Sequence, residues 1–209
     1  MIGGPGGNSR VPIGQEAFVV VDPQPAAASD ELLAAIAKLS SKPIRFVINT
    51  SVDLEHTGGN EALRSGDTAI VAHELTRLWM STEYYVDWED TTYKPRESAA
   101  LPTRTFYATD PQPIVAKIGD EEIEYGHLPE AHTDGDIYVL FKNRNVLVAG
   151  GAVTFGEYPV IDHATGGWIG GLVAATRKLL DITNPETLVV PANGPAQPRA
   201  HLERPLAML

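Results

Sequence analysis

The side chains best suited to chemistry gather in two short polar segments of the sequence. Residues 49–60 read Asn-Thr-Ser-Val-Asp-Leu-Glu-His-Thr-Gly-Gly-Asn, and residues 131–136 read Ala-His-Thr-Asp-Gly-Asp. Carboxylate and imidazole groups bind divalent metal ions and transfer protons in general acid–base catalysis. Asp53 and Glu55 of the first segment are therefore the candidate catalytic groups.

Strand and helix patterns alternate around these segments. Short β-branched apolar runs predict strands, and apolar residues at helical spacing predict helices. The expected strands span residues 17–21, 44–48, 69–72, 103–107, 114–118, 122–125, 137–141, 145–148 and 187–190; the expected helices span 31–39, 60–64, 74–80 and 168–180, with a weak helix in the tail. Ser29 or Asp30 offers an N-cap for the first helix. The alternation predicts a layered α/β fold with the strands inside.

Residues 82–102 show neither the strand nor the helix period. The segment contains two prolines, several charges and four aromatic residues, Tyr84, Tyr85, Trp88 and Tyr93. We interpret it as a surface excursion from a single domain that spans residues 1–209. Its aromatic residues either stack on a ligand or anchor a partner, or they pack the excursion onto its own domain.

Four separated segments resemble motifs of the metallo-β-lactamase superfamily. Residues 49–60 resemble its Asn-Thr-His-x-His-x-Asp-His-x-Gly-Gly-Asn loop, and residues 131–136 resemble its His-Thr-x-Gly-Asp segment. Residues 146–151 match the strand that normally ends in Gly-Asp, and residues 190–195 match the late Pro-Gly-His-Gly-Pro turn. The order and spacing of these segments agree with the family over residues 10–200.

The resemblance implies an α/β (α+β) fold, namely a four-layer αββα sandwich whose site lies where loops converge at the sheet edges. It also implies two zinc or iron ions that share a hydroxide. The family usually has an extra strand before the glycine-rich residues 3–8, and this chain begins too late to supply it. We therefore expect the usual first strand to be missing. The exposed sheet edge that results would favour a homo-oligomer.

Carried over position by position, the resemblance gives an incomplete set of metal ligands. The family's first metal would have Ser51, Asp53 and His132, its second would have Glu55, His56 and Asn193, and the bridging aspartate position is Gly151. Neutral hydroxyl and amide groups are weak ligands, and a glycine offers none. Each metal position keeps two good ligands, whereas catalytic zinc usually has three from the protein.

Two functions remain open on this reading. The first is a non-catalytic homologue with a degraded dinuclear site, which serves in binding or assembly and takes a small-molecule ligand or a protein partner. The second is a hydrolase of ester, lactone or amide bonds with one weakly held metal ion. That ion would be zinc, iron or manganese, bound by Asp53, Glu55, His56 and His132.

Other polar residues offer weaker candidates. A nucleophile pair of Ser51 with His56 or His132 is one alternative, although the chain has no Gly-x-Ser-x-Gly motif. His163 could act as a general base or a ligand, but a solvated loop histidine is the commoner case. The glycines of residues 3–7 lack the Lys-Ser/Thr of a phosphate loop, so we expect a tight turn beside the site.

Charge and composition exclude several classes of function. The chain has 27 acidic against 16 basic residues and a net charge of −11, and an acidic surface repels nucleic acid. It has no cysteine, which excludes disulfides and thiolate metal sites. No apolar run approaches the roughly 20 residues of a membrane helix. The first residues are too rich in glycine for a signal peptide. We expect a soluble protein of the cytoplasm or the periplasm.

Overall fold

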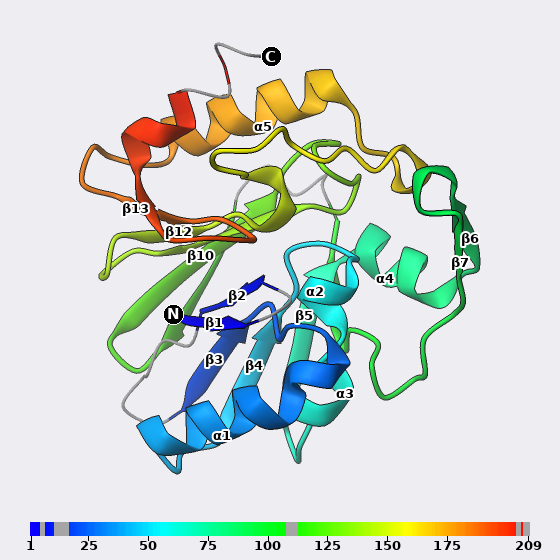
Figure 1. Ribbon diagram of the computed structural model, residues 1–209. Helices are drawn as coiled ribbons and strands as arrows, with labels where there is room; N and C mark the ends of the chain where they lie inside the picture. The colour runs from blue at the N-terminus through cyan, green and yellow to red at the C-terminus, as the bar shows by residue number, and fades with distance from the viewer. Residues whose placement is uncertain (5–6, 11–16, 108–112, 204–205, 207–209) are drawn as a thin grey trace.

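The computed structural model describes residues 1–4, 7–10, 17–107, 113–203 and 206. Its helices and sheets stack in four layers in the order helix, sheet, sheet, helix (Figure 1). This is the αββα arrangement that the resemblance to the family implied. Within the described residues, no helix is both long and apolar enough to cross a membrane.

One inner layer is a four-stranded parallel sheet in the order β3-β4-β5-β8. Its strands are β3 (Phe18–Val21), β4 (Ile44–Ile48), β5 (Ala69–His73) and β8 (Arg104–Phe106). Every residue of β3 and β5 is buried, as expected for a parallel sheet covered on both faces. Because the strands are parallel, their carboxyl ends share one edge, and the polar residues 49–60 begin at that edge.

The other inner layer is a six-stranded sheet in the order β14-β13-β12-β11-β10-β9. Its strands are β9 (Ile114–Ile118), β10 (Glu121–His127), β11 (Ile137–Phe141), β12 (Val146–Val148), β13 (Leu188–Val190) and β14 (Gln197–Pro198). All neighbours are antiparallel except β12 and β13, which are parallel. The polar residues 131–136 connect β10 to β11 and so lie at one end of this sheet.

Helices cover the outer face of each sheet. The helices are α1 (Ser29–Leu39), α2 (Leu54–Thr57), α3 (Asn60–Leu63), α4 (Glu74–Ser81) and α5 (Ile169–Asp181). In Figure 1, α5 covers the six-stranded sheet, and α1 and α3 cover the face of the four-stranded sheet that points away from the six-stranded sheet. Short 3₁₀ turns are η1 (Ala26–Ala28), η2 (Asp87–Glu89), η3 (Gly150–Ala152), η4 (His163–Thr165) and η5 (Arg199–Leu202).

Three apolar clusters fill the three spaces between the layers. The first joins α5 to the six-stranded sheet through residues such as Leu172 and Leu147. The second lies between the two sheets and includes Val71 and Phe141. The third packs α1 and α3 on the four-stranded sheet. Because alternate residues of one strand enter different clusters, the same strands supply two interfaces at once.

The predicted N-cap of α1 was wrong. The N-cap position is Ala28, and no side chain caps the helix. The turn η1 runs directly into α1, so that Ser29 already has helical dihedral angles and its N–H bonds to the carbonyl of Ala26. Asp30 then lies in the first turn, where its charge favours the helix dipole instead of capping the backbone.

Residues 82–102 contain a small β-hairpin that the sequence did not reveal. Strands β6 (Tyr84–Val86) and β7 (Thr91–Tyr93) pair antiparallel around η2. The rings of Tyr84 and Tyr93 stack with centroids 5.1 Å apart, and Trp79 of α4 meets Tyr84 edge-on at 5.5 Å. These contacts place the hairpin beside α4, at the right of Figure 1.

A second hairpin precedes the sheets. Strands β1 (Ile2–Gly4) and β2 (Gly7–Ser9) pair antiparallel, and the tight turn expected between them includes residues 5–6, which lie outside the described residues. The Asn8 side chain donates to the carbonyls of Pro191, at 3.1 Å, and Gly194, at 2.7 Å. This fixes β2 against the turn that carries Asn193.

Candidate functional site

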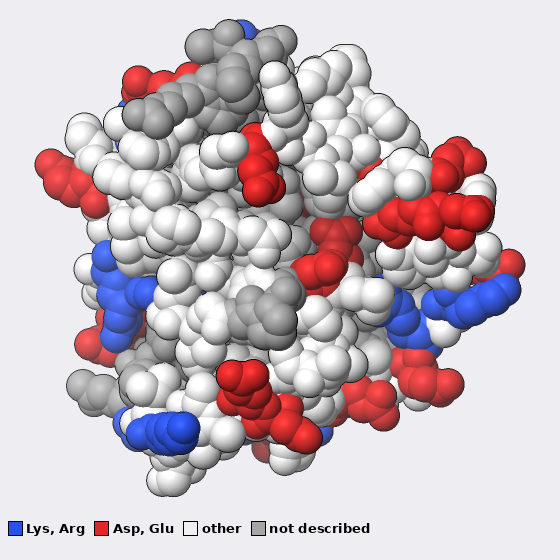
Figure 2. All heavy atoms as spheres, in the orientation of Figure 1, with Lys and Arg blue, Asp and Glu red and all other residues white. Residues whose placement is uncertain are grey.

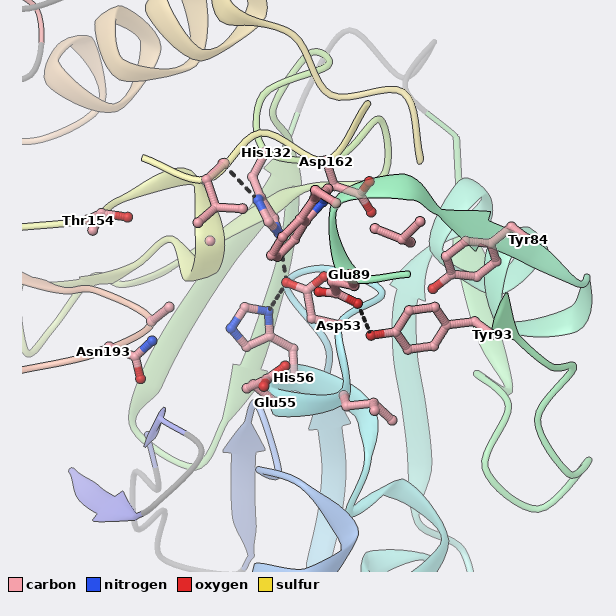
Figure 3. A pocket seen from close by; sticks show the side chains of 16 residues that line it. Asp53, Glu55, His56, Tyr84, Glu89, Tyr93, His132, Thr154, Asp162 and Asn193 are labelled. Carbon is pink, nitrogen blue, oxygen red and sulfur yellow. Dashed lines mark hydrogen bonds and ion pairs between the residues drawn. The ribbon is translucent and has the colours of Figure 1, made fainter. Parts of the chain in front are cut away.

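A cleft of about 240 Å³ lies at the edge where the loops of both sheets meet the β6–β7 hairpin (Figure 3). It is lined by Asp53, Leu54, Glu55, His56, Tyr84, Val86, Trp88, Glu89, Tyr93, His132, Gly151, Thr154, Val160, Asp162, Ala192 and Asn193. The fold thus brings six of the seven positions carried over from the family motifs to one cavity. The seventh, Ser51, is fully buried directly behind them.

Two buried asparagines hold the first polar segment in shape. The amides of Asn49 and Asn60 bond to each other reciprocally at 2.8 and 2.9 Å. Asn49 also donates to the carbonyl of His56 at 2.6 Å, and Asn60 donates to that of Ala100 at 2.9 Å. Between them, Gly59 packs so closely on the backbone of Pro23 that a side chain at this position would collide with it. The loop is therefore a rigid platform for the residues it carries.

Asp53 and His132 form the central contact of the cleft. His132 Nε2 lies 2.7 Å from Asp53 Oδ2, and His132 Nδ1 lies 3.0 Å from the carbonyl oxygen of Val160. Because both oxygens only accept hydrogen bonds, each ring nitrogen donates a proton, and the ring is an imidazolium. The side chain of His132 is 8% exposed and that of Asp53 is 24% exposed.

The pKa values of this pair move in opposite directions. Burial alone would lower the pKa of His132, but the neighbouring Asp53 overrides burial and raises that pKa to about 10. Burial also opposes ionisation of Asp53, yet the charge of His132 holds the pKa of this carboxyl well below its usual range. Both groups are therefore charged at neutral pH.

A buried carboxylate fixes the backbone of His132. Asp136 Oδ2 accepts from the N–H groups of His132, at 2.6 Å, and Thr133, at 3.0 Å. Its Oδ1 accepts from the Thr133 hydroxyl at 2.6 Å. Burial raises the pKa of Asp136 to about 6. Asp136 thus positions His132 from behind and does not face the cleft.

Ser51 links Asp53 to His56. Its hydroxyl oxygen lies 2.9 Å from Asp53 Oδ2 and 2.6 Å from His56 Nδ1. A carboxylate cannot donate, so the hydroxyl donates to Asp53 and accepts from His56 Nδ1. The other ring nitrogen, His56 Nε2, has no partner among the described residues and points away from Asp53 (Figure 3). Ser51 contacts His56 and not His132, and its buried, bonded hydroxyl is a poor nucleophile.

Gly151 lies against the ring of His132. A Cβ built on Gly151 would be 2.5 Å from the ring carbon Cδ2. The preceding residue, Gly150, has φ = +49° and packs on the side chain of Thr50. The short turn η3 therefore needs both glycines in order to approach the two polar segments.

The remaining predicted positions lie further from the Asp53–His132 contact. Glu55 is exposed at the rim, and no described residue forms an ion pair with it. Asn193 is exposed on the turn that Asn8 holds. His163 lies outside the cleft, with Nδ1 3.0 Å from the carbonyl of Gly167. Among the described residues, no group of three or more His, Cys, Asp and Glu side chains is arranged to hold a metal ion.

The sequence did not identify several residues of the cleft wall. Glu89 accepts the hydroxyl of Tyr93 at 2.6 Å, and Asp162 caps η4 by accepting from the N–H of Ala164 at 2.9 Å. Three of the four aromatic residues noted in 82–102 line the cleft; Tyr85 faces solvent. The spacing of Glu89 and Tyr93 could have indicated that their side chains bond to each other. That spacing has a meaning only once the hairpin is known.

Comparisons with known proteins identify the family and agree with the fold. The sequence matches the family model of the metallo-beta-lactamase superfamily over residues 6–197. The fold is similar to that of a metallo-beta-lactamase from Pontibacter korlensis, with a TM-score of 0.76 and 19% identity, covering 97% of this chain and 86% of that one. The crystal structure of DIM-1 metallo-beta-lactamase is also similar, with a TM-score of 0.73, 16% identity and coverage of 96% and 85%. Comparison with curated proteins gives no match.

Proposed function

Because the chain belongs to the metallo-beta-lactamase superfamily, we propose that it is a non-catalytic homologue of the hydrolases, which binds a ligand in the cleft without a dinuclear metal centre. The observation that carries this proposal is the contact of Gly151 with the ring of His132. The family's bridging aspartate would occupy this position. Here there is neither a donor nor room for one, and the residues do not fit two adjacent cations.

The hydrogen bonds of the cleft also support the proposal. Both nitrogens of His132 are committed to oxygen acceptors, and Asp53 accepts from His132 and Ser51. A histidine must be deprotonated before it can bind a metal ion. Metal binding would therefore have to break the ion pair of His132 as well as remove its proton. The charges of the pair satisfy each other instead.

One observation favours the second function, a hydrolase with a single metal ion. His56 Nε2 has no partner among the described residues, and the Glu55 carboxylate lines the same cleft without a described ion-pair partner. These two groups belong to the four ligands that the sequence proposed. Asp53 and His132 would complete the set only if their mutual contact opened.

Metal analysis of protein purified from its native source separates the two functions. We expect much less than one zinc, iron or manganese ion per chain, and no hydrolysis of an ester, lactone and amide panel. A content of about two ions per chain would overturn the proposal. A content of about one ion, lost with hydrolysis in His132→Ala but kept in His163→Ala, would establish the single-metal enzyme. His163 is the matched control because it lies outside the cleft.

A further inference from the structure

The cleft combines unpaired carboxylates, aromatic rings and a buried imidazole nitrogen without a partner among the described residues. From this combination we infer that its ligand is a small organic ammonium ion. The inference rests on the proposed function, since it names the ligand class of the same cleft. Three independent properties of the described residues support it.

The first property is charge. Glu55, Glu89 and Asp162 line the cleft, and none of them forms an ion pair with a described Lys or Arg. Among the described residues the lining contains neither Lys nor Arg, and the nearby Arg96 interacts with the side chain of Tyr84. The charge of Asp53 is balanced by His132. Figure 2 shows acidic side chains at the hollow near the centre of this face and on the projection beside it. The cleft is therefore net negative, which attracts cations and repels anions.

Asp162 is the most informative of these carboxylates. It is only 7% exposed, and its two oxygens accept from the neutral N–H of Ala164 and the neutral hydroxyl of Thr165, at 2.9 and 2.8 Å. Neutral donors stabilise the charge but do not cancel it. A carboxylate in such surroundings gains more from a nearby cation than an exposed one does.

The second property is the aromatic wall. Trp88, which is 64% exposed, lines the cleft together with Tyr84 and Tyr93. The Tyr93 hydroxyl donates to Glu89 at 2.6 Å, which fixes a negative charge next to the ring. Ammonium groups are attracted to the faces of aromatic rings, most strongly to tryptophan. An aromatic wall with a carboxylate attached to it suits an organic cation better than a bare metal ion.

The third property is the free nitrogen of His56. The residue is 4% exposed and lines the cleft, and its Nε2 has no partner among the described residues. Nδ1 contacts the Ser51 hydroxyl at 2.6 Å, so Nε2 is the ring nitrogen that is left for a ligand in the cleft. A hydroxyl group can both donate and accept, and therefore satisfies this nitrogen in either protonation state of the ring. Hydroxylated ammonium ions supply such a group.

The test compares choline with 3,3-dimethyl-1-butanol, its neutral carbon isostere, by calorimetric titration at low ionic strength. Both molecules have the same shape and hydroxyl, so that only the charge differs. The full chain is first dialysed against a chelator. We expect choline to bind at least about tenfold more tightly than the alcohol. Equal affinities, or no binding of either molecule, would overturn the inference. Ethanolamine in a third titration shows whether N–H donors add affinity.

Two variants and their matched controls locate the binding. Trp88→Ala and Glu89→Gln should each weaken choline binding by about tenfold, because one removes an aromatic face and the other a charge. Trp168→Ala and Glu31→Gln make the same chemical changes at exposed residues outside the cleft and should leave the affinity unchanged. Equal losses in variants and controls would contradict the assignment to this cleft.

The outcome is distinguishable from that of the metal analysis. Choline binding to chelator-treated protein reports only on the cleft, whereas metal content and hydrolysis report on the proposed function. A chain that binds choline and also carries about two metal ions would contradict the proposed function alone. A metal-free chain that does not bind choline would contradict only the inference of an ammonium ligand.

Discussion

Gly151 and His132 occupy adjoining space with no gap for a side chain between them. A Cβ on Gly151 would approach His132 Cδ2 to 2.5 Å, closer than real Cβ contacts come. The ring cannot move aside freely, because its two nitrogens bond to Asp53 and to the carbonyl of Val160. The absence of a side chain at residue 151 is thus part of the packing of the cleft as well as of its chemistry.

Gly151→Ala is therefore expected to destabilise the fold. It adds one methyl group against a bonded ring, which should reduce the free energy of unfolding by about 1–3 kcal/mol. Gly3→Ala is the control, since a Cβ there meets only the Asn8 side chain at 3.6 Å and should change stability little. Urea denaturation of both variants gives the comparison. Gly151→Asp, which restores the family's residue, should be at least as unstable; gain of a metal ion by this variant would refute the reasoning.

The Asp53–His132 pair predicts a loss of stability in alkali. The pKa of His132 is raised from 6.5 to about 10 by folding. A raised pKa contributes stability that is complete below the unfolded value and is lost as the pH rises towards the folded value. The free energy of unfolding should therefore decline between pH 6.5 and about 10.

Asp53→Asn tests the origin of that decline. Without the carboxylate, the decline should flatten, and near neutral pH the free energy of unfolding should fall by about 2 kcal/mol, allowing for the partial exposure of Asp53. Asp181→Asn makes the same change at an exposed position and should keep the wild-type pH profile. An unchanged alkaline slope in Asp53→Asn would show that another group causes it.

The motifs predicted which residues would meet, but not how they would meet. Four segments placed Asp53, His56, His132 and Gly151 in one site, and all four residues line one cleft. The direct hydrogen bond between Asp53 and His132 joins residues 79 positions apart. It depends on how two loops from two different sheets are placed relative to each other. No local sequence pattern encodes that placement.

The helices and strands that were predicted correctly are defined by local sequence, and those that were missed depend on tertiary contacts or are too short to show a pattern. Strand β4 and strand β11 coincide with the predicted residues because apolar runs bounded by polar turns define them locally. The β6–β7 hairpin was missed because its strands alternate weakly and depend on the stacked rings of Tyr84 and Tyr93. Helix α2 is a single turn, too short for any helical period to appear.

Burial of His73 should make the free energy of unfolding fall in acid. Its Nδ1 accepts from the N–H of Leu75 at 3.3 Å, and its ring stacks on His127 with centroids 4.2 Å apart. Burial lowers the pKa of His73 from 6.5 to about 4, and His127 adds to the effect. Protonation is thus easier in the unfolded chain, so the free energy of unfolding should fall as the pH drops from 6.5 towards 4.

Replacing His73 by asparagine separates titration from capping. Asparagine can still accept at the N-terminus of α4, but it takes up no proton, so that the acid decline should become shallower. His73→Ala loses the cap as well and should be less stable than His73→Asn by about 1 kcal/mol at every pH. Both profiles come from thermal or urea unfolding between these pH limits. If His73→Asn keeps the full acid decline, the decline arises from another group.

The reciprocal amide pair of Asn49 and Asn60 should be among the most sensitive positions near the cleft. Both residues are fully buried, and Asn60→Ala would remove both bonds between the two amides and the donor to the Ala100 carbonyl, while Asn49 keeps only its bond to the carbonyl of His56. Unsatisfied buried groups of this kind cost about 1–3 kcal/mol each, so the variant should lose about 2–4 kcal/mol.

The chain contains its own control for this loss. Asn145 and Asn184 form a reciprocal amide pair at 2.9 and 3.3 Å, but on the surface. Water can replace the lost partner there, so Asn184→Ala should cost less than about 1 kcal/mol. The two pairs consist of the same groups and differ in burial. The difference between the losses of unfolding free energy in Asn60→Ala and Asn184→Ala therefore measures the cost of leaving buried polar groups without partners. Equal losses at the two sites would mean that the loop holding Asp53 and His56 does not depend on the buried pair.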